Sequence, residues 1–150
     1  MRWASAVSLE KSLDVALKEC LQSIGSQLDG KHPDLIVMFL SPELDRQLSD
    51  ISVQIRPQLP HGLIFGCTAT GIIGDATEVE HAPGLSVTAA LLPGVRLSPF
   101  HFNVSTLPSP DASPNVWQRL VSTDSSEPIE PHFILLADPF TIDGDALLSG

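Results

Sequence analysis

A six-residue apolar run, Leu35–Leu40, lies between Pro33 and Pro42 and constrains the fold more than any other feature of the chain. A continuous apolar run of this length is typical of a strand that is covered on both faces, as in the sheets of α/β proteins. The segment 62–67, with the sequence GLIFGC, has the same character. The sequence therefore predicts an α/β fold in which these two segments are buried strands.

Amphipathic helices are predicted before each of these strands. Between residues 8 and 30, apolar residues recur at spacings of three and four, which places them on one face of a helix. We expect Ser8 to cap the N-terminus of this helix and Gly30 to end it. A second apolar stripe runs from Leu44 to Ile55. With a short strand over 2–7, this order predicts parallel strands joined by right-handed crossovers.

The pattern changes after residue 84. Two strand-like segments, 85–94 and 95–104, meet at a proline-glycine dipeptide, which favours an antiparallel hairpin. The apolar segment 132–138 is predicted to be a last buried strand. The fold class is therefore α/β with a mixed sheet and helices packed on it. A βαβαβ start is followed by an antiparallel hairpin and a further buried strand.

The segment 105–131 is rich in proline and serine, and we expect a loop that contains one short helix over 115–123. At 150 residues and 16.1 kDa the chain has the length of a single domain, which we assign to 1–150. Residues 141–150 resemble the start of a helix. We therefore expect the chain to be a fragment of a longer protein.

The formal net charge of −10 bears on the class of partner. An acidic surface repels phosphate backbones and anionic lipid headgroups, so we expect neither nucleic acid nor membrane as a partner. The longest apolar run is far shorter than the roughly 20 residues of a membrane helix. The N-terminus has no signal-peptide pattern, and two cysteines indicate no disulfide framework. These features predict a cytoplasmic protein with reduced thiols.

The candidate binding site follows the second apolar run, at GCTATG, because ligands of open α/β sheets gather beyond the carboxyl ends of strands. Glycines leave peptide amides uncovered, and threonine hydroxyls both donate and accept hydrogen bonds. This suits a carboxylate or another small polar group. The same small residues also suit a strand exit where a neighbouring element packs closely. The predicted ligand-binding residues, which include two from neighbouring strand ends, are Gly66, Cys67, Thr68, Thr70, Gly71, Ser41 and Asp138.

Catalytic, metal and cofactor sites are not predicted. Cys67 lacks the glycine spacing of a nucleophile elbow, and His61 lies at the opposite end of the same strand. Cys20 falls on the apolar stripe of the first helix, where a buried thiol is expected. The five histidines show no metal-ligand spacing, and no phosphate-binding or dinucleotide fingerprint occurs.

The order of elements, with the motif Gly66, Cys67, Thr68 and the following Gly71, resembles the N-terminal part of a FIST domain. The resemblance covers roughly residues 3–150. It implies an intracellular sensory module for small ligands, with amino acids suggested, and a C-terminal FIST half as partner. The family often has an acidic residue after the second glycine, where this chain has Ile72. That departure puts an amino-acid ligand in doubt.

Three functions are consistent with these observations. The leading hypothesis is a sensory domain that binds a small polar molecule in signal transduction and is not an enzyme. The alternative is a protein-interaction scaffold without a small ligand, and the third is an enzyme that uses Cys67 as its thiol. An inaccessible 66–71 turn favours the scaffold over the sensor.

Overall fold

The computed structural model describes residues 1–45, 53, 55–57, 61–109, 111–121, 131–138, 140–142 and 144–149. Two compact units, Met1–Val95 and Arg96–Gly150, divide the chain. Compact units are not domains by themselves, so the single domain over 1–150 stays a prediction.

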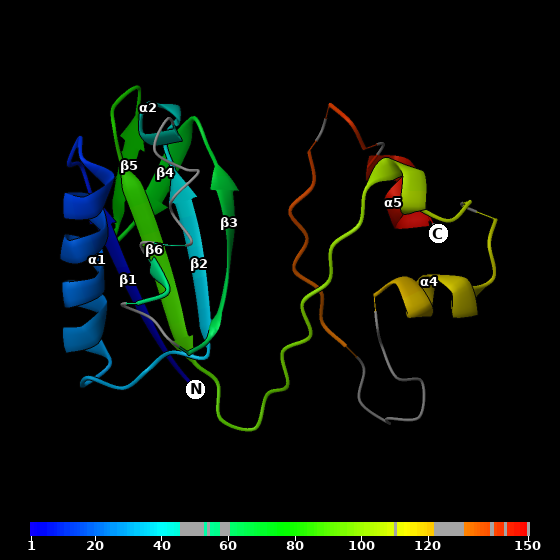
Figure 1. Cartoon of the computed structure of the whole chain (residues 1–150), viewed down its shortest axis with the longest axis horizontal. Helices are drawn as coiled ribbons and strands as arrows, with labels where there is room; N and C mark the ends of the chain where they lie inside the picture. The colour runs from blue at the N-terminus through cyan, green and yellow to red at the C-terminus, as the bar shows by residue number, and fades with distance from the viewer. Residues whose placement is uncertain are drawn as a thin grey trace. The chain divides into compact units, whose positions relative to one another are not determined.

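The first unit is built on a four-stranded sheet with the order β1-β6-β2-β3 (Figure 1). Its strands are β1 (Arg2–Ser8), β2 (Leu35–Leu40), β3 (Leu63–Thr68) and β6 (Leu85–Leu91). β6 is antiparallel to both β1 and β2, whereas β2 and β3 are parallel. The predicted α/β class and mixed sheet are confirmed.

Both ends of β2 are fixed by hydrogen bonds of flanking residues. Before the strand, Asp34 accepts a hydrogen bond from the Leu92 amide on Oδ2 (2.7 Å) and another from the Leu63 amide on its carbonyl (2.8 Å). After the strand, the Ser41 hydroxyl accepts from the Gly84 amide (3.0 Å), and the Ser41 amide donates to the Gly84 carbonyl (2.9 Å). These bonds hold the register of β2 against both neighbouring strands.

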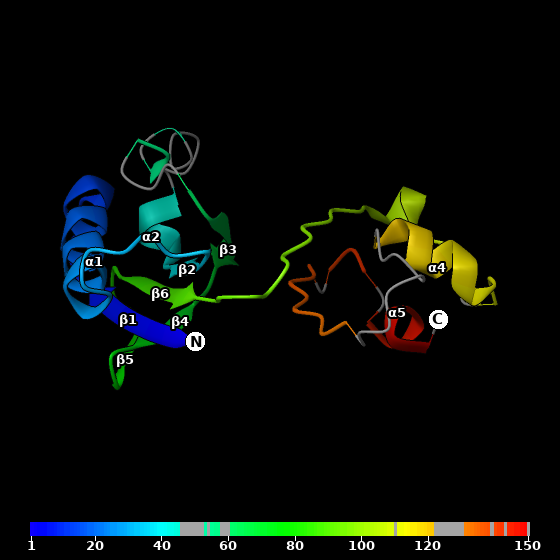
Figure 2. The same ribbon diagram turned by 90° about the horizontal axis from the view of Figure 1, so that it is seen from below.

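Helix α1 (Leu13–Gln27) covers one face of the sheet (Figure 2). Its buried stripe packs with alternate residues of the strands, which accounts for the core. The core side chains are Ala4, Ala6, Leu13, Ala16, Leu17, Cys20, Ile24, Leu28, Ile36, Met38, Leu40, Leu44, Ile55, Leu85, Val87 and Ala89.

The predicted start of this helix is wrong, and its predicted end is confirmed. Ser12, not Ser8, is the N-cap residue. Ser8 ends β1, where it is buried and donates a hydrogen bond from its hydroxyl to Glu19 (2.6 Å). Beyond the helix, Gly30 has φ +70°, a left-handed conformation that favours glycine, and its amide donates to the Gly25 carbonyl (2.8 Å).

The opposite face of the sheet carries a two-stranded hairpin, β4 (Gly71–Gly74) and β5 (Thr77–Glu80) (Figure 2). Its turn residues Asp75 and Ala76 both have positive φ, as a type I′ turn requires. The hairpin is held to the sheet by the Ser86 hydroxyl, which donates to the Ile73 carbonyl (2.6 Å), and by the Asp75 amide, which donates to the Ser5 hydroxyl (3.3 Å).

The prediction that both buried strands are covered on both faces is wrong for the described residues. Val37 and Phe39 of β2 are only half-buried, as are Leu63–Phe65 of β3. Gly66–Thr68 are exposed. The apolar runs report a preference for burial, and within the described part of the first unit α1, the small hairpin, Leu44 and Ile55 supply the cover.

The second predicted helix is described only in part. α2 (Pro42–Asp45) begins after Ser41, as the proline pattern indicated, and both Leu44 and Ile55 are buried. Leu48 and Ile51 lie outside the described residues.

The second unit has three short helices and no strand among its described residues. They are the 3-10 helix η2 (Val104–Thr106), α4 (Pro114–Leu120) and α5 (Gly144–Ser149). α4 confirms the helix predicted inside the proline-rich segment, and α5 confirms the helix start predicted near residue 141. No described residue of this unit is buried.

Two strand predictions fail in this unit. The segment 96–103 contains no strand, so β6 has no hairpin partner there and pairs instead with β1 and β2. The segment 132–138 is exposed and unpaired in the described structure, whereas a buried strand was predicted. A strand needs a neighbour for its amides, and no described segment supplies one.

The packing of α1 predicts a clear difference between two neighbouring positions. Leu17 is fully buried, so Leu17→Ala should lower the free energy of unfolding by about 2–5 kcal/mol. Val15→Ala, on the exposed side of the same helix, should change it by less than about 0.5 kcal/mol. Urea denaturation of both variants measures this. Equal losses would mean that α1 does not cover the sheet as described.

Candidate functional site

The carboxyl ends of β2 and β3 lie together at one edge of the sheet. Because the two strands are parallel, Leu40 pairs with Thr68, and the next amide, that of Ala69, donates to the Leu40 carbonyl (2.9 Å). Ser41 therefore lies beside the exit of β3. The sequence placed these two strand ends together correctly.

The exit of β3 is open to solvent in the first unit. Five of the predicted ligand-binding residues are exposed, namely Gly66, Cys67, Thr68, Thr70 and Gly71. The chain turns at Ala69 and Thr70 and continues at once into β4. The exit is thus accessible, while the binding role of these residues stays a prediction.

Peptide amides on the outer side of β3 have no partner strand in the described structure. The Leu63 and Ala69 amides both donate to β2 or its flanking residue, at 2.8 and 2.9 Å. Since peptide groups alternate along a strand, the amides of Ile64, Gly66 and Thr68 point to the other side. β3 is the last strand in the sheet order. Its edge therefore presents hydrogen-bond donors without any charged side chain between Leu63 and Thr68.

Gly66 is required for packing. A Cβ atom at this position would overlap with the carbonyl oxygen of Met38 on the neighbouring strand. The close-packing interpretation of this glycine is therefore correct. Gly71 differs, because a Cβ atom there would meet only the Glu80 side chain, at 3.6 Å, and the Val79 carbonyl, at 3.9 Å, which are ordinary contacts.

Ser41 and Asp138 both make structural hydrogen bonds, and their predicted ligand-binding role stays a prediction. Ser41 is buried, and its hydroxyl oxygen accepts the Gly84 amide, so it fixes the end of β2. Asp138 belongs to the second unit, where its carboxylate accepts from the Phe140 amide (3.0 Å) and from the Thr141 hydroxyl (3.1 Å). Strand patterns could not reveal these hydrogen bonds. The partner of Ser41 is distant in the sequence, and the partners of Asp138 lie in a local turn.

The two thiols lie in contrasting surroundings. Cys67 is exposed on β3, and Cys20 is buried in α1, as its apolar stripe predicted. The Cys20 thiol donates to the Leu85 carbonyl (3.6 Å). Burial raises the pKa of Cys20 to about 11, and the neighbouring Glu19 carboxylate adds to this increase.

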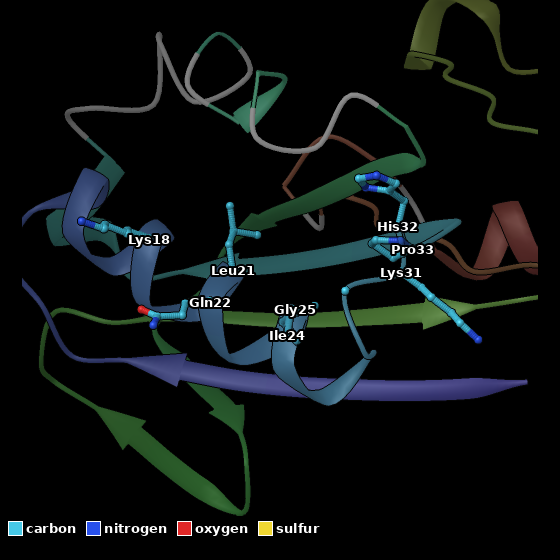
Figure 3. A pocket seen from close by; sticks show the side chains of 9 residues that line it. Lys18, Leu21, Gln22, Ile24, Gly25, Lys31, His32 and Pro33 are labelled. Carbon is cyan, nitrogen blue, oxygen red and sulfur yellow. The ribbon is translucent and has the colours of Figure 1, made fainter.

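A surface hollow of about 320 Å³ lies at the C-terminal end of α1 (Figure 3). None of the predicted ligand-binding residues lines it, and sequence analysis gave no signal for it. Its wall combines apolar side chains of α1 with two lysines and a histidine. The lining residues are Lys18, Leu21, Gln22, Ile24, Gly25, Gly30, Lys31, His32 and Pro33.

Metal-binding and membrane-spanning features are both absent from the described residues. No group of three or more His, Cys, Asp or Glu side chains in this part of the chain is arranged to hold a metal ion. Within the same residues, no helix has the length and apolarity that crossing a membrane requires.

Comparison with known proteins gives one match. A family model described as the FIST N domain matches residues 34–150. The match begins at the residue before β2 and includes the open exit of β3, but not β1 or α1. No curated protein and no solved structure matches the chain.

The two glycines of the exit are expected to differ in their tolerance of a methyl group. Gly66→Ala should lower the free energy of unfolding by about 1–3 kcal/mol, because β2 and β3 must move apart. Gly71→Ala should leave it unchanged within about 0.5 kcal/mol. Thermal and urea unfolding of both variants measures the difference. A Gly66→Ala protein as stable as the parent would contradict the close approach of the two strands.

The thiols should differ in alkylation by iodoacetamide. In the folded chain Cys67 should react, whereas Cys20 should be protected until the protein unfolds.

The raised pKa of Cys20 also predicts a pH dependence of stability. Folding raises the pKa of this thiol from its ordinary value of 9.0. Unfolded chains therefore lose the thiol proton first, and stability should fall as pH rises from 9 to about 11.

Mass spectrometry of each cysteine peptide gives the two alkylation rates, and Cys20→Ala is the control for the pH effect. Fast alkylation of Cys20 under native conditions would contradict its burial. Fast alkylation of Cys67 by itself reflects exposure and does not indicate a catalytic thiol.

Proposed function

The chain belongs to the FIST N domain family, and on that premise we propose that it is a sensory domain that binds a small polar molecule. FIST domains are generally regarded as sensory domains of signal transduction. The observation that carries the ligand-binding part of the proposal is the open exit of β3. There, uncharged small residues are exposed, and the outward-pointing amides of β3 face no partner strand among the described residues.

The chemistry of the exit favours an acceptor-rich ligand. Amides on the outer side of β3 donate hydrogen bonds, and the hydroxyls of Thr68 and Thr70 supply further donors on exposed side chains. A carboxylate accepts from several such groups without needing a cationic side chain. The proposed ligand is therefore a small carboxylate held by backbone amides and threonine hydroxyls.

An amino-acid ligand is less well supported than a simple carboxylate. An ammonium group needs an acceptor, and Ile72 occupies the position where the family often has an acid. Its side chain is buried and packs against Gly84. Asp75 lies at the far end of β4, in the hairpin turn. These two positions favour a ligand without an amine.

The proposed output is a change in association with a C-terminal FIST half of the same protein. In this proposal, a ligand bound at the edge of β3 favours the arrangement of this domain and the C-terminal half that completes the site. Hinge-type binding proteins close around their ligands in this way. In this proposal the domain binds its ligand without chemical turnover, and Cys67 lines the exit without acting as a nucleophile.

A protein-interaction scaffold is the second candidate, and exposed apolar side chains favour it. Phe133, Ile134, Leu135 and Leu136 are all at least 40% exposed, and Phe140 is 96% exposed. Apolar surface of this kind is typical of contact sites. The accessible 66–71 turn argues the other way, since the scaffold hypothesis expects that turn to be closed.

The carboxylate proposal predicts a specific thermal shift. Acetate, lactate, succinate, alanine and glutamate are the probes, each titrated into the full chain. A carboxylate present at 100 times its Kd should stabilise the protein by about 2.7 kcal/mol. Thr68→Val should weaken that response, because it removes a donor from the exit. Thr77→Val, on the exposed side of the hairpin, is the matched control.

Two results would overturn the proposal. One is the absence of a shift with every probe, and the other is an equal response from Thr68→Val and the parent protein. A response to alanine but not to lactate would replace the simple carboxylate by an amino acid.

A further inference from the structure

Serine-proline dipeptides flank a nearly uncharged segment of the second unit. Ser98-Pro99 begins this segment and Ser113-Pro114 ends it, with Asp111 as the single acidic residue between them and no Lys or Arg. A third dipeptide, at residues 109–110, has its proline outside the described residues. The chain has one more such pair, Ser41-Pro42 in the first unit.

Exposure separates the described pairs into two classes. Ser98 and Ser113 are exposed, and so are the prolines that follow them. Ser113 is extended, with φ −62° and ψ +150°, and its side chain makes no capping hydrogen bond to α4. Ser41, by contrast, is 3% exposed, and its hydroxyl is held by the Gly84 amide.

Proline after serine has two local effects. Its ring disfavours the helical conformation of the preceding residue and so keeps the serine extended. It also has no amide hydrogen, so the proline cannot donate to a hydrogen-bonded ladder. An exposed, extended serine with an accessible hydroxyl and a following proline is the substrate form that proline-directed serine kinases accept.

We propose that Ser98 and Ser113 are phosphorylation sites for a proline-directed serine kinase that uses ATP. The serine Oγ attacks the γ-phosphorus, an Oγ–P bond forms, and the bond from that phosphorus to the bridging oxygen of ADP breaks. The hydroxyl proton passes to the base of the kinase, and ADP leaves. The reaction is a phosphoryl transfer without any redox change.

The modification changes the local charge strongly. Each phosphate adds about −1.5 to −2 near neutral pH, so two add roughly −3 to −4 to a segment that has a single carboxylate. Ser98 lies two residues from Phe100, whose ring stacks on Phe102 (centroids 5.8 Å apart) and meets Phe133 edge-on (6.2 Å). Phosphorylation thus places charge beside an aromatic cluster of the second unit. This modification is separate from the ligand binding proposed at β3.

The test treats the full chain with a proline-directed serine kinase and ATP, and maps phosphate by mass spectrometry of peptides. Phosphate is expected on Ser98 and Ser113 and not on Ser41. The heat-unfolded chain should also take phosphate on Ser41, since burial alone protects it. Pro99→Ala should abolish labelling of Ser98 only, and Pro114→Ala labelling of Ser113 only.

Ser105 provides the matched control. It is exposed in the same segment but is followed by Thr106, and its hydroxyl donates to Asn103 (2.5 Å). Ser105→Ala should leave total incorporation unchanged. The proposal is overturned by labelling of Ser105 as fast as Ser98, by labelling of Ser41 in the folded chain, or by proline variants that are labelled like the parent. A folded chain that takes no phosphate at either serine also overturns it.

Discussion

The placement of β2 between an antiparallel and a parallel neighbour is the constraint on which the rest of the first unit depends. Asp34 ties the start of the strand to β6 and β3, and Ser41 ties its end to the start of β6. With β2 fixed at both ends, the exit of β3 must lie beside the exit of β2. The pairing register of β2 and β3 therefore sets the geometry of the candidate site.

Local patterns predicted the elements of the first unit well. The spacing of apolar residues located α1, and the two apolar runs located β2 and β3, because these features depend on residues close together in the sequence. The insertion of β6 between β1 and β2 was not predicted, since pairing of Arg2 with Leu91 joins residues at opposite ends of the unit. The role of Ser8 was missed for the same reason. Its hydroxyl does not cap the start of α1 but donates to Glu19, which is distant in the sequence.

For the candidate site, the sequence located one contiguous segment at a strand exit, and the ligand-binding role of the predicted residues stays a prediction. Residues 66–71 share one strand exit, so a single correct strand assignment placed them all. Ser41 and Asp138 were assigned from their positions after apolar runs, but their hydroxyl and carboxylate groups are committed to structural hydrogen bonds. The apolar segment 132–138 shows that an apolar run specifies a need for burial without identifying the surface that provides it.

The central claim is that the outer amides of β3 have no partner strand among the described residues, and hydrogen exchange at single-residue resolution tests it most directly. The account predicts slow exchange for the amides of Leu63 and Ala69, which donate toward β2, and fast exchange for those of Ile64, Gly66 and Thr68. Equal protection of Gly66, Thr68 and Ala69 in the chain without ligand would contradict it, because the edge of β3 would then already be covered.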